Sequence, residues 1–186
     1  MTPFSKSAMA ALVALGLGVT TPAQAATPTV QVTSDGGAAV VHATLEVAAP
    51  PAVVWRNLTD PDAIARIMVS VKSVRILQSD PAGHWQVREQ VTKGGLAPSL
   101  RVVTRAEFQP NASLRFHRID GDIKQLDGEW KLAPLDGGAR TALTYDSRMT
   151  PPAGAPAFIV RAALRKDTTE SLTNLRAASE ATRHAP

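Results

Sequence analysis

Hydrophobic residues alternate with polar ones along several short stretches of the chain, a period of two that is typical of β-strands with one buried face. In the first stretch, residues 41–47, the apolar positions are Val41, Ala43, Leu45 and Val47. Six more stretches follow, separated by turn residues: 71–77, 85–92, 100–108, 114–120, 123–132 and 141–149. The pattern predicts seven antiparallel strands.

Helical patterns flank this run of strands. Proline fits the first turn of a helix, so Pro51 is expected to begin a helix over 51–58, and Asp60 and Pro61 to begin a second one that ends at Met68. Near the C-terminus, apolar residues recur at helical spacing: Val160, Leu164, Leu172, Leu175 and Ala178. This spacing predicts one amphipathic helix over 157–181, roughly 37 Å long at about 1.5 Å per residue. A helix of that length can cover one face of a sheet.

Together these elements predict an α+β fold in which a seven-stranded curved antiparallel sheet surrounds a long C-terminal helix. Aromatic residues make up only 4% of the chain, so the inner side chains are mostly of modest size. If the sheet curves around the helix without closing, the space between them can remain a ligand cavity. A solid core of small side chains is the alternative, and the sequence leaves both open.

Three passages carry a resemblance to a known family. They are Pro50 to Trp55 leading into Leu58-Thr59-Asp60, the pair Gly121-Asp122 with Gly128-Glu129-Trp130, and the leucines of the final helix. With the order of elements, they resemble the helix-grip fold of the START-like (SRPBCC) superfamily, which includes polyketide cyclases, coenzyme Q-binding proteins and lipid-transfer domains. The resemblance covers residues 39 to about 180, and we place the domain at 39–182. It implies a binding site for a hydrophobic small molecule.

Candidate ligand-binding residues come from the predicted inner faces of the strands. Polar groups that interrupt an inward face could orient an otherwise apolar ligand, and aromatic residues could line its cavity. The candidates are Trp85, Glu89, Phe108, Phe116, Arg118, Trp130, Tyr145 and Met149. The aromatic residues could instead be ordinary core. Glu89 and Arg118 could instead form a structural salt bridge, or a bulge could move one of them to the surface.

Composition excludes several classes of function. Without cysteine, the chain has no disulfide, thiolate metal site or cysteine nucleophile. A net charge of +4 is too small for the basic surface of a nucleic-acid-binding protein. None of the four histidines is predicted to converge with another, and no catalytic or phosphate-binding motif is present. We therefore predict no catalytic residue, no metal and no cofactor, and we expect no nucleic-acid partner.

The first residues have the pattern of a secretory signal peptide. Lys6 supplies a positive charge, 8–19 is an apolar run, and Ala23-Gln24-Ala25 is a small-x-small cleavage site. The run would span about 18 Å as a helix, too short for a hydrocarbon core of about 30 Å. We predict a signal peptide over 1–25, a leader or extra strand over 26–38, and a periplasmic or secreted mature protein.

These observations predict an exported carrier for a lipid, isoprenoid or polyketide-like molecule. We expect a monomer with no stable membrane insertion once the signal peptide is cleaved. Two alternatives remain: a cyclase or aromatase that uses the same cavity, with Glu89 and Tyr145 as its acid–base pair, and a module that binds another envelope protein.

Overall fold

The computed structural model describes residues 27–93, 98–151 and 154–183. The predicted signal peptide lies outside the described residues. Eight strands, three α-helices and one short 3-10 helix follow in this order: β1 (Thr29–Asp35), β2 (Ala38–Val47), α1 (Pro51–Thr59), α2 (Pro61–Ile67), β3 (Val71–Ser79), β4 (Trp85–Thr92), β5 (Arg101–Gln109), β6 (Ser113–Gly121), β7 (Leu126–Leu135), η1 (Asp136–Gly138), β8 (Arg140–Met149) and α3 (Ala157–Arg183).

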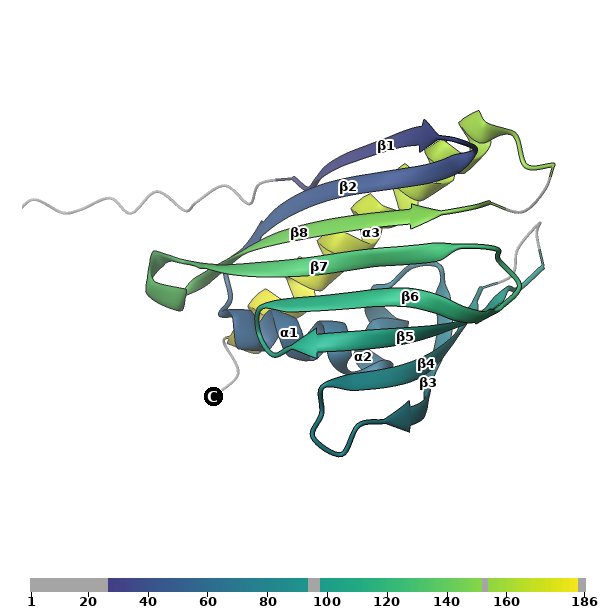
Figure 1. Cartoon of the computed structure of the whole chain (residues 1–186). Helices are drawn as coiled ribbons and strands as arrows, with labels where there is room; N and C mark the ends of the chain where they lie inside the picture. The colour runs from purple at the N-terminus through teal and green to yellow at the C-terminus, as the bar shows by residue number, and fades with distance from the viewer. Residues whose placement is uncertain (1–26, 94–97, 152–153, 184–186) are drawn as a thin grey trace, which may run out of the picture.

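All eight strands form one antiparallel sheet in the order β1-β2-β8-β7-β6-β5-β4-β3 (Figure 1). The first strand β2 of the predicted domain pairs with its last strand β8, while β3 lies at the far edge. The segment before residue 39 is not a loose leader, because β1 pairs with β2 along its whole length and adds an eighth, edge strand. The predicted α+β architecture with its long C-terminal helix is confirmed.

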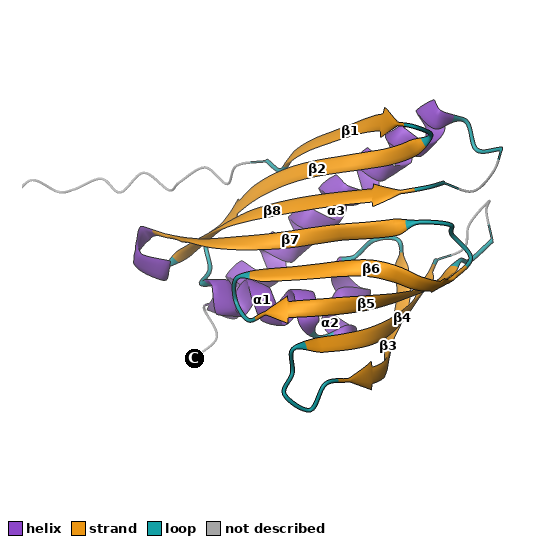
Figure 2. Cartoon of the chain, viewed as in Figure 1, coloured by secondary structure: helices purple, strands orange, loops and turns teal. Residues whose placement is uncertain are grey.

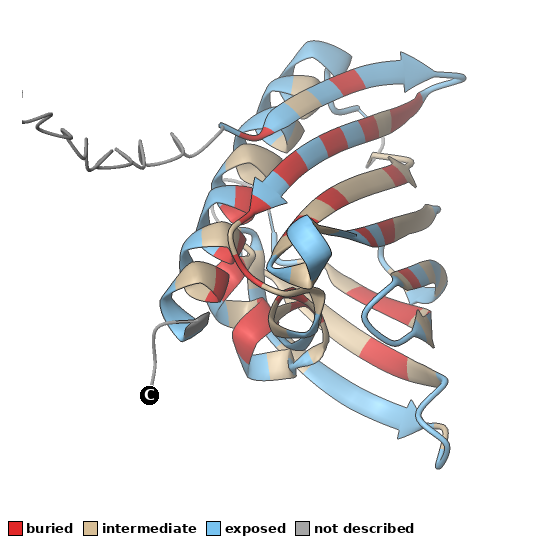
Figure 3. Cartoon of the chain, turned by 90° about the vertical axis from the view of Figure 1, so that its left-hand side faces the viewer, coloured by how far each residue is buried: buried red, intermediate tan, exposed pale blue. Residues whose placement is uncertain are grey.

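The α-helices all cover the same face of the sheet (Figure 2). Helix α3 runs diagonally behind β1, β2 and β8, and packs against β1, β2 and α1. The two short helices lie behind the other half of the sheet, and α2 packs on β3. The sheet curves around these helices, which leaves its opposite face to solvent (Figure 3).

Local sequence explains where the short helices begin. Pro51 occupies the first turn of α1, and Pro61 that of α2, where a missing N–H group costs nothing. The Asp60 carboxylate accepts a hydrogen bond from the Ala63 N–H at 2.7 Å and so caps α2. These caps fix a sharp turn between the helices, which keeps both on the concave side of the sheet.

Among the described residues, no helix is both long and apolar enough to cross a membrane.

Candidate functional site

A cavity of about 220 Å³ lies between the sheet and the helices. Its walls come from α1, α2, the connection between α2 and β3, strands β3 to β8, and α3. The lining residues are Leu58, Ile64, Met68, Ser70, Val71, Arg88, Gln90, Thr104, Ala106, Leu114, Phe116, Leu126, Trp130, Tyr145, Leu164, Asp167, Thr168, Ser171 and Leu172. The volume lies between an engineered cavity of about 150 Å³ that binds benzene and the usual ligand-pocket minimum of about 300 Å³. It suits a small ligand.

The deeper part of the cavity is apolar and aromatic. The Trp130 and Tyr145 rings stack with centroids 4.1 Å apart and planes inclined by 26°. Beside them, the Phe116 ring lies across Gly128, where a Cβ atom would come within 2.6 Å of the ring. The same Cβ atom would come within 2.5 Å of the Asp146 carbonyl oxygen, so a larger residue at 128 would displace both the Phe116 ring and the neighbouring strand β8.

One wall, formed by β4 and β5, is polar. Arg88 is 5% exposed, and its side chain donates to the Gln86 Oε1 atom at 3.0 Å and to the carbonyl oxygens of Leu58 and Thr59 at 3.5 and 3.2 Å. Its guanidinium also lies 5.0 Å from the centre of the Phe108 ring. Burial lowers the pKa of Arg88 to about 10, so the side chain remains charged at neutral pH.

Helix α3 contributes a second ionisable group, Asp167. Burial raises the pKa of this carboxyl, and the neighbouring charge of Glu170 raises it further. Burial also raises the pKa of the Tyr145 hydroxyl, so it stays neutral. Across the described residues, no cluster of three or more His, Cys, Asp or Glu side chains could hold a metal ion.

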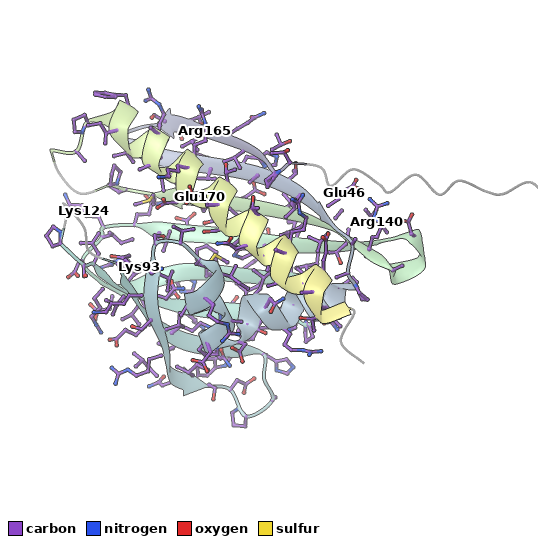
Figure 4. All side chains as sticks on the ribbon, turned by 180° about the vertical axis from the view of Figure 1, so that it is seen from behind. Glu46, Lys93, Lys124, Arg140, Arg165 and Glu170 are labelled. Atoms are coloured by element: carbon purple, nitrogen blue, oxygen red, sulfur yellow. The ribbon has the colours of Figure 1, made fainter. Side chains whose placement is uncertain are left out.

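The cavity opens at one end of the sheet, between α3, the connection from α2 to β3 and the start of β7. Lining residues there, such as Ser70, Leu126 and Leu164, are exposed or partly exposed, while Ala106 and Leu172 are buried. The Ser171 hydroxyl accepts a hydrogen bond from the Val69 N–H at 3.0 Å, which ties this connection to α3. Lys93 and Lys124 mark this end of the sheet in Figure 4.

Three of the eight candidate residues line the cavity: Phe116, Trp130 and Tyr145. They come from three adjacent strands, β6, β7 and β8, whose inward faces follow the expected alternation. The other five do not line it. Phe108 is near, but its ring packs edge-on against Trp55 at 5.8 Å and lies beside Arg88.

The inward face that we expected for β4 is wrong by one residue. Glu89 lies on the outer face and forms ion pairs with Arg101 at 2.6 Å and with Arg75 at 2.9 Å. Trp85 also faces outward, where the Arg105 guanidinium stacks 4.2 Å from its ring centre. Long arginine side chains cover the apolar residues on this side, so those residues are shielded from water without facing the core.

The Glu89–Arg118 salt bridge, one of the structural alternatives, does not form, because the carboxylate of Glu89 pairs with Arg75 and Arg101. Arg118 donates to the Gly121 carbonyl oxygen at 2.9 Å, and its buried Nε atom has no hydrogen-bond partner. Met149 ends β8, opposite Leu126 of β7. With Glu89 outside and Tyr145 inside, the acid–base pair that we expected of a cyclase does not form.

Sequence reasoning missed seven polar cavity residues: the ionisable Arg88 and Asp167, the amide Gln90, and the hydroxyl residues Ser70, Thr104, Thr168 and Ser171. In β4 the adjacent charges Arg88 and Glu89 must face opposite sides, and the apolar neighbours of Glu89 favoured the wrong choice. Asp167 was missed because a single carboxylate on a long helix is usually a solvated side chain. Only their position in the fold distinguishes these cavity residues from polar residues on the surface.

The curved sheet, the long covering helix and the cavity between them define a helix-grip, START-like protein. A family model described as "Polyketide cyclase / dehydrase and lipid transport" matches residues 47–176, and the chain belongs to this family. The expected superfamily is thereby confirmed, and family and fold together support hydrophobic ligand binding.

Solved structures with the same fold include a Zhui aromatase/cyclase from Streptomyces sp. R1128, with 20% identity and a TM-score of 0.60 over 78% of this chain and 93% of that one. A STAR-related lipid transfer protein from Xanthomonas axonopodis has 16% identity and a TM-score of 0.63, over 81% of this chain and 98% of the other. Among curated proteins, the Ribosome association toxin RatA of Escherichia coli strain K12 is 28% identical over 81 residues. That match covers 44% of this chain and 49% of RatA, about half of the relative's length.

Proposed function

We propose that the protein is an exported carrier that holds one small, largely apolar molecule in the cavity and shields it from water. The observation that carries the proposal is the cavity itself, which is open at one end: its deeper wall is formed by Leu114, Phe116, Trp130 and Leu172, with no side chain filling the volume between them. A tightly packed core would have no such space.

The apolar wall can supply the affinity without any chemistry. Each buried methylene contributes about 0.8 kcal/mol, so a chain of about eight carbons gains roughly 6 kcal/mol before the costs of association. The partly open end near Leu126 and Leu164 offers a route of entry. Binding and release, with no covalent step, are what such a site supports.

The decisive experiment is native mass spectrometry of the protein purified from the envelope of its own cell, followed by organic extraction. A carrier should show a mass increment that disappears on extraction, and the extract should contain a compound small enough for the cavity. The matched control is Ala106→Leu, which fills part of the cavity and should be purified without the increment. An empty protein that instead co-purifies with an envelope protein would support the interaction module.

Export has its own test. The order of Lys6, the apolar run 8–19 and Ala23-Gln24-Ala25 supports cleavage after Ala25. Amino-terminal sequencing of the protein recovered from the envelope should therefore begin at Ala26. A chain recovered from the cytoplasm with Met1 at its start would contradict the proposal.

A further inference from the structure

The buried cation Arg88 lacks a partner of opposite charge. Among the ion pairs of the described residues, none involves Arg88, although its side chain is almost entirely enclosed. Its sequence neighbour Glu89 is committed to Arg75 and Arg101 on the other face of the sheet. The protein thus balances the charges on the outside of β4 and leaves the one on the inside unbalanced.

Neutral groups compensate part of that charge. The Leu58 and Thr59 carbonyls belong to the last turn of α1, where the helix carries about half a negative elementary charge. A guanidinium has five N–H donors, and the bonds to Gln86, Leu58 and Thr59 use three of them. Each guanidinium nitrogen thus has one neutral partner. No contact within the described part of the chain supplies an opposite charge, although burying a full charge is costly without one.

The residues around Arg88 line the cavity, so its uncompensated charge borders that space. Thr104 lies directly opposite Arg88 in the β4–β5 pairing, Gln90 follows on the same face, and all three line the cavity. Leu114, Phe116 and Trp130 supply the apolar wall. The cavity therefore has a cationic wall on β4 and β5 and an apolar wall on β6 and β7, while α3 adds the carboxyl of Asp167, which forms no ion pair with Arg88.

Resting on the carrier function proposed above, we infer that the ligand is an amphiphile with an anionic group, a carboxylate or its equivalent. The Arg88 guanidinium binds that group, with Gln90 and Thr104 beside it, and the apolar part of the ligand lies against Phe116 and Trp130. Arg88 is thus a specificity-determining residue, because a guanidinium matches the two oxygens of a carboxylate and an alcohol offers it only one.

The test compares two ligands of equal chain length, octanoate and 1-octanol, by isothermal titration calorimetry at neutral pH. Wild-type protein should bind octanoate at least tenfold more tightly. In Arg88→Met this preference should fall below twofold while octanol binding is retained. The control Arg105→Met removes an equal charge from the outer face and should keep the full preference.

A second measurement uses the wild-type protein alone, in case Arg88→Met fails to fold. In nitrogen-15 NMR spectra, octanoate should shift the Arg88 Nε–H resonance, while octanol should shift it far less and neither ligand should move that of Arg105. The conservative variant Arg88→Lys identifies the resonance and should keep part of the preference.

The possible failures are distinguishable. Equal binding of octanoate and octanol would overturn the anionic anchor and leave the carrier function standing. A preference that survives in Arg88→Met as fully as in Arg105→Met, or an unmoved Arg88 resonance in octanoate-bound wild type, would overturn the role of Arg88. If neither ligand binds while native mass spectrometry shows a carried molecule, this inference fails alone; if the natively purified protein also carries nothing, the carrier function fails with it.

Discussion

The layer between sheet and helices differs in its two halves. Under α3, the inward residues of β2 form a dry, continuous core: Val41, Ala43, Leu45 and Val47 are each at most 4% exposed (Figure 3). Over β4 to β6, the inward positions include Arg88, Gln90 and Thr104, and they face the cavity. The same sheet, covered from the same side, is filled with hydrocarbon in one half and left hollow and partly polar in the other.

This difference shows which half maintains the fold and which is free for a ligand. Strand β2 packs against α3, whose Leu175 is 0% exposed, so close packing holds that half together. The hollow half is closed by α2 and by the short connection from α2 to β3. Helix α3 holds both through two hydrogen bonds: the Ser171 hydroxyl accepts from the Val69 N–H, and the Asn174 Nδ2 donates to the Ile67 carbonyl at 3.2 Å. Its stability depends less on filling the interior.

Truncating one leucine in each half should give the largest difference in the free energy of unfolding. Leu175 is 0% exposed in the packed half, so Leu175→Ala should lower the free energy of unfolding by about 2–5 kcal/mol. Leu164 lines the hollow half and is partly exposed, so Leu164→Ala should cost about 1 kcal/mol or less. Urea unfolding followed by circular dichroism measures both. Equal losses would show that the halves are packed alike.

Enlarging an alanine in each half tests the same contrast from the other direction. Ala43 is enclosed in the packed half, so Ala43→Leu should cost about 1–3 kcal/mol through overpacking. Ala106 lines the cavity, so Ala106→Leu should cost less than about 1 kcal/mol and weaken octanoate binding at least tenfold. Calorimetry and urea unfolding of the two variants supply the readouts. If Ala106→Leu is as destabilising as Ala43→Leu, the space beside Ala106 is not available to a ligand.

Two carboxyl groups, Asp167 in the cavity and Glu89 on the outer face of the sheet, should affect stability in opposite directions as the pH changes. These effects should be smaller than those of the substitutions above. Burial holds the pKa of Asp167 above its ordinary 3.8, so its ionisation favours unfolding as the pH rises; Asp167→Asn should be more stable than wild type at pH 7, and this advantage should vanish at about pH 3. Hydrogen bonds from Arg101 and Arg75 hold the pKa of Glu89 below its ordinary 4.5. Its stabilisation is present above that value and lost as the pH falls through the folded pKa, so Glu89→Gln should lose more stability relative to wild type at pH 7 than at about pH 3.

Unfolding curves of wild type and both variants at these two pH values give the comparison. A loss of stability in Asp167→Asn at pH 7, or a gain in Glu89→Gln, would contradict the directions assigned to the two carboxyl groups.

Site residues could be predicted from the sequence in strands where the alternation of apolar and polar residues identifies a single inward face. Leu114 and Phe116 share an apolar face flanked by Arg115 and His117, so their inward orientation follows from the strand alone. In β4, by contrast, apolar Val87 and Val91 and charged Glu89 share one face, while Gln86, Arg88 and Gln90 share the other. Because apolar side chains usually face the core, the valines were expected to face inward, whereas in the structure Arg88 and Gln90 line the cavity.

By itself, the sequence determined the order of strands and helices, because alternation, helical spacing and Pro or Asp caps act over a few neighbouring residues. It also determined the family, through motifs at the turns and along the last helix. Only the tertiary structure decided which face of β4 borders the cavity, which arginines bind Glu89, and that Arg88 has no counter-charge. These depend on the register between strands distant in sequence and on what covers each face of the sheet, and no local pattern of residues encodes either.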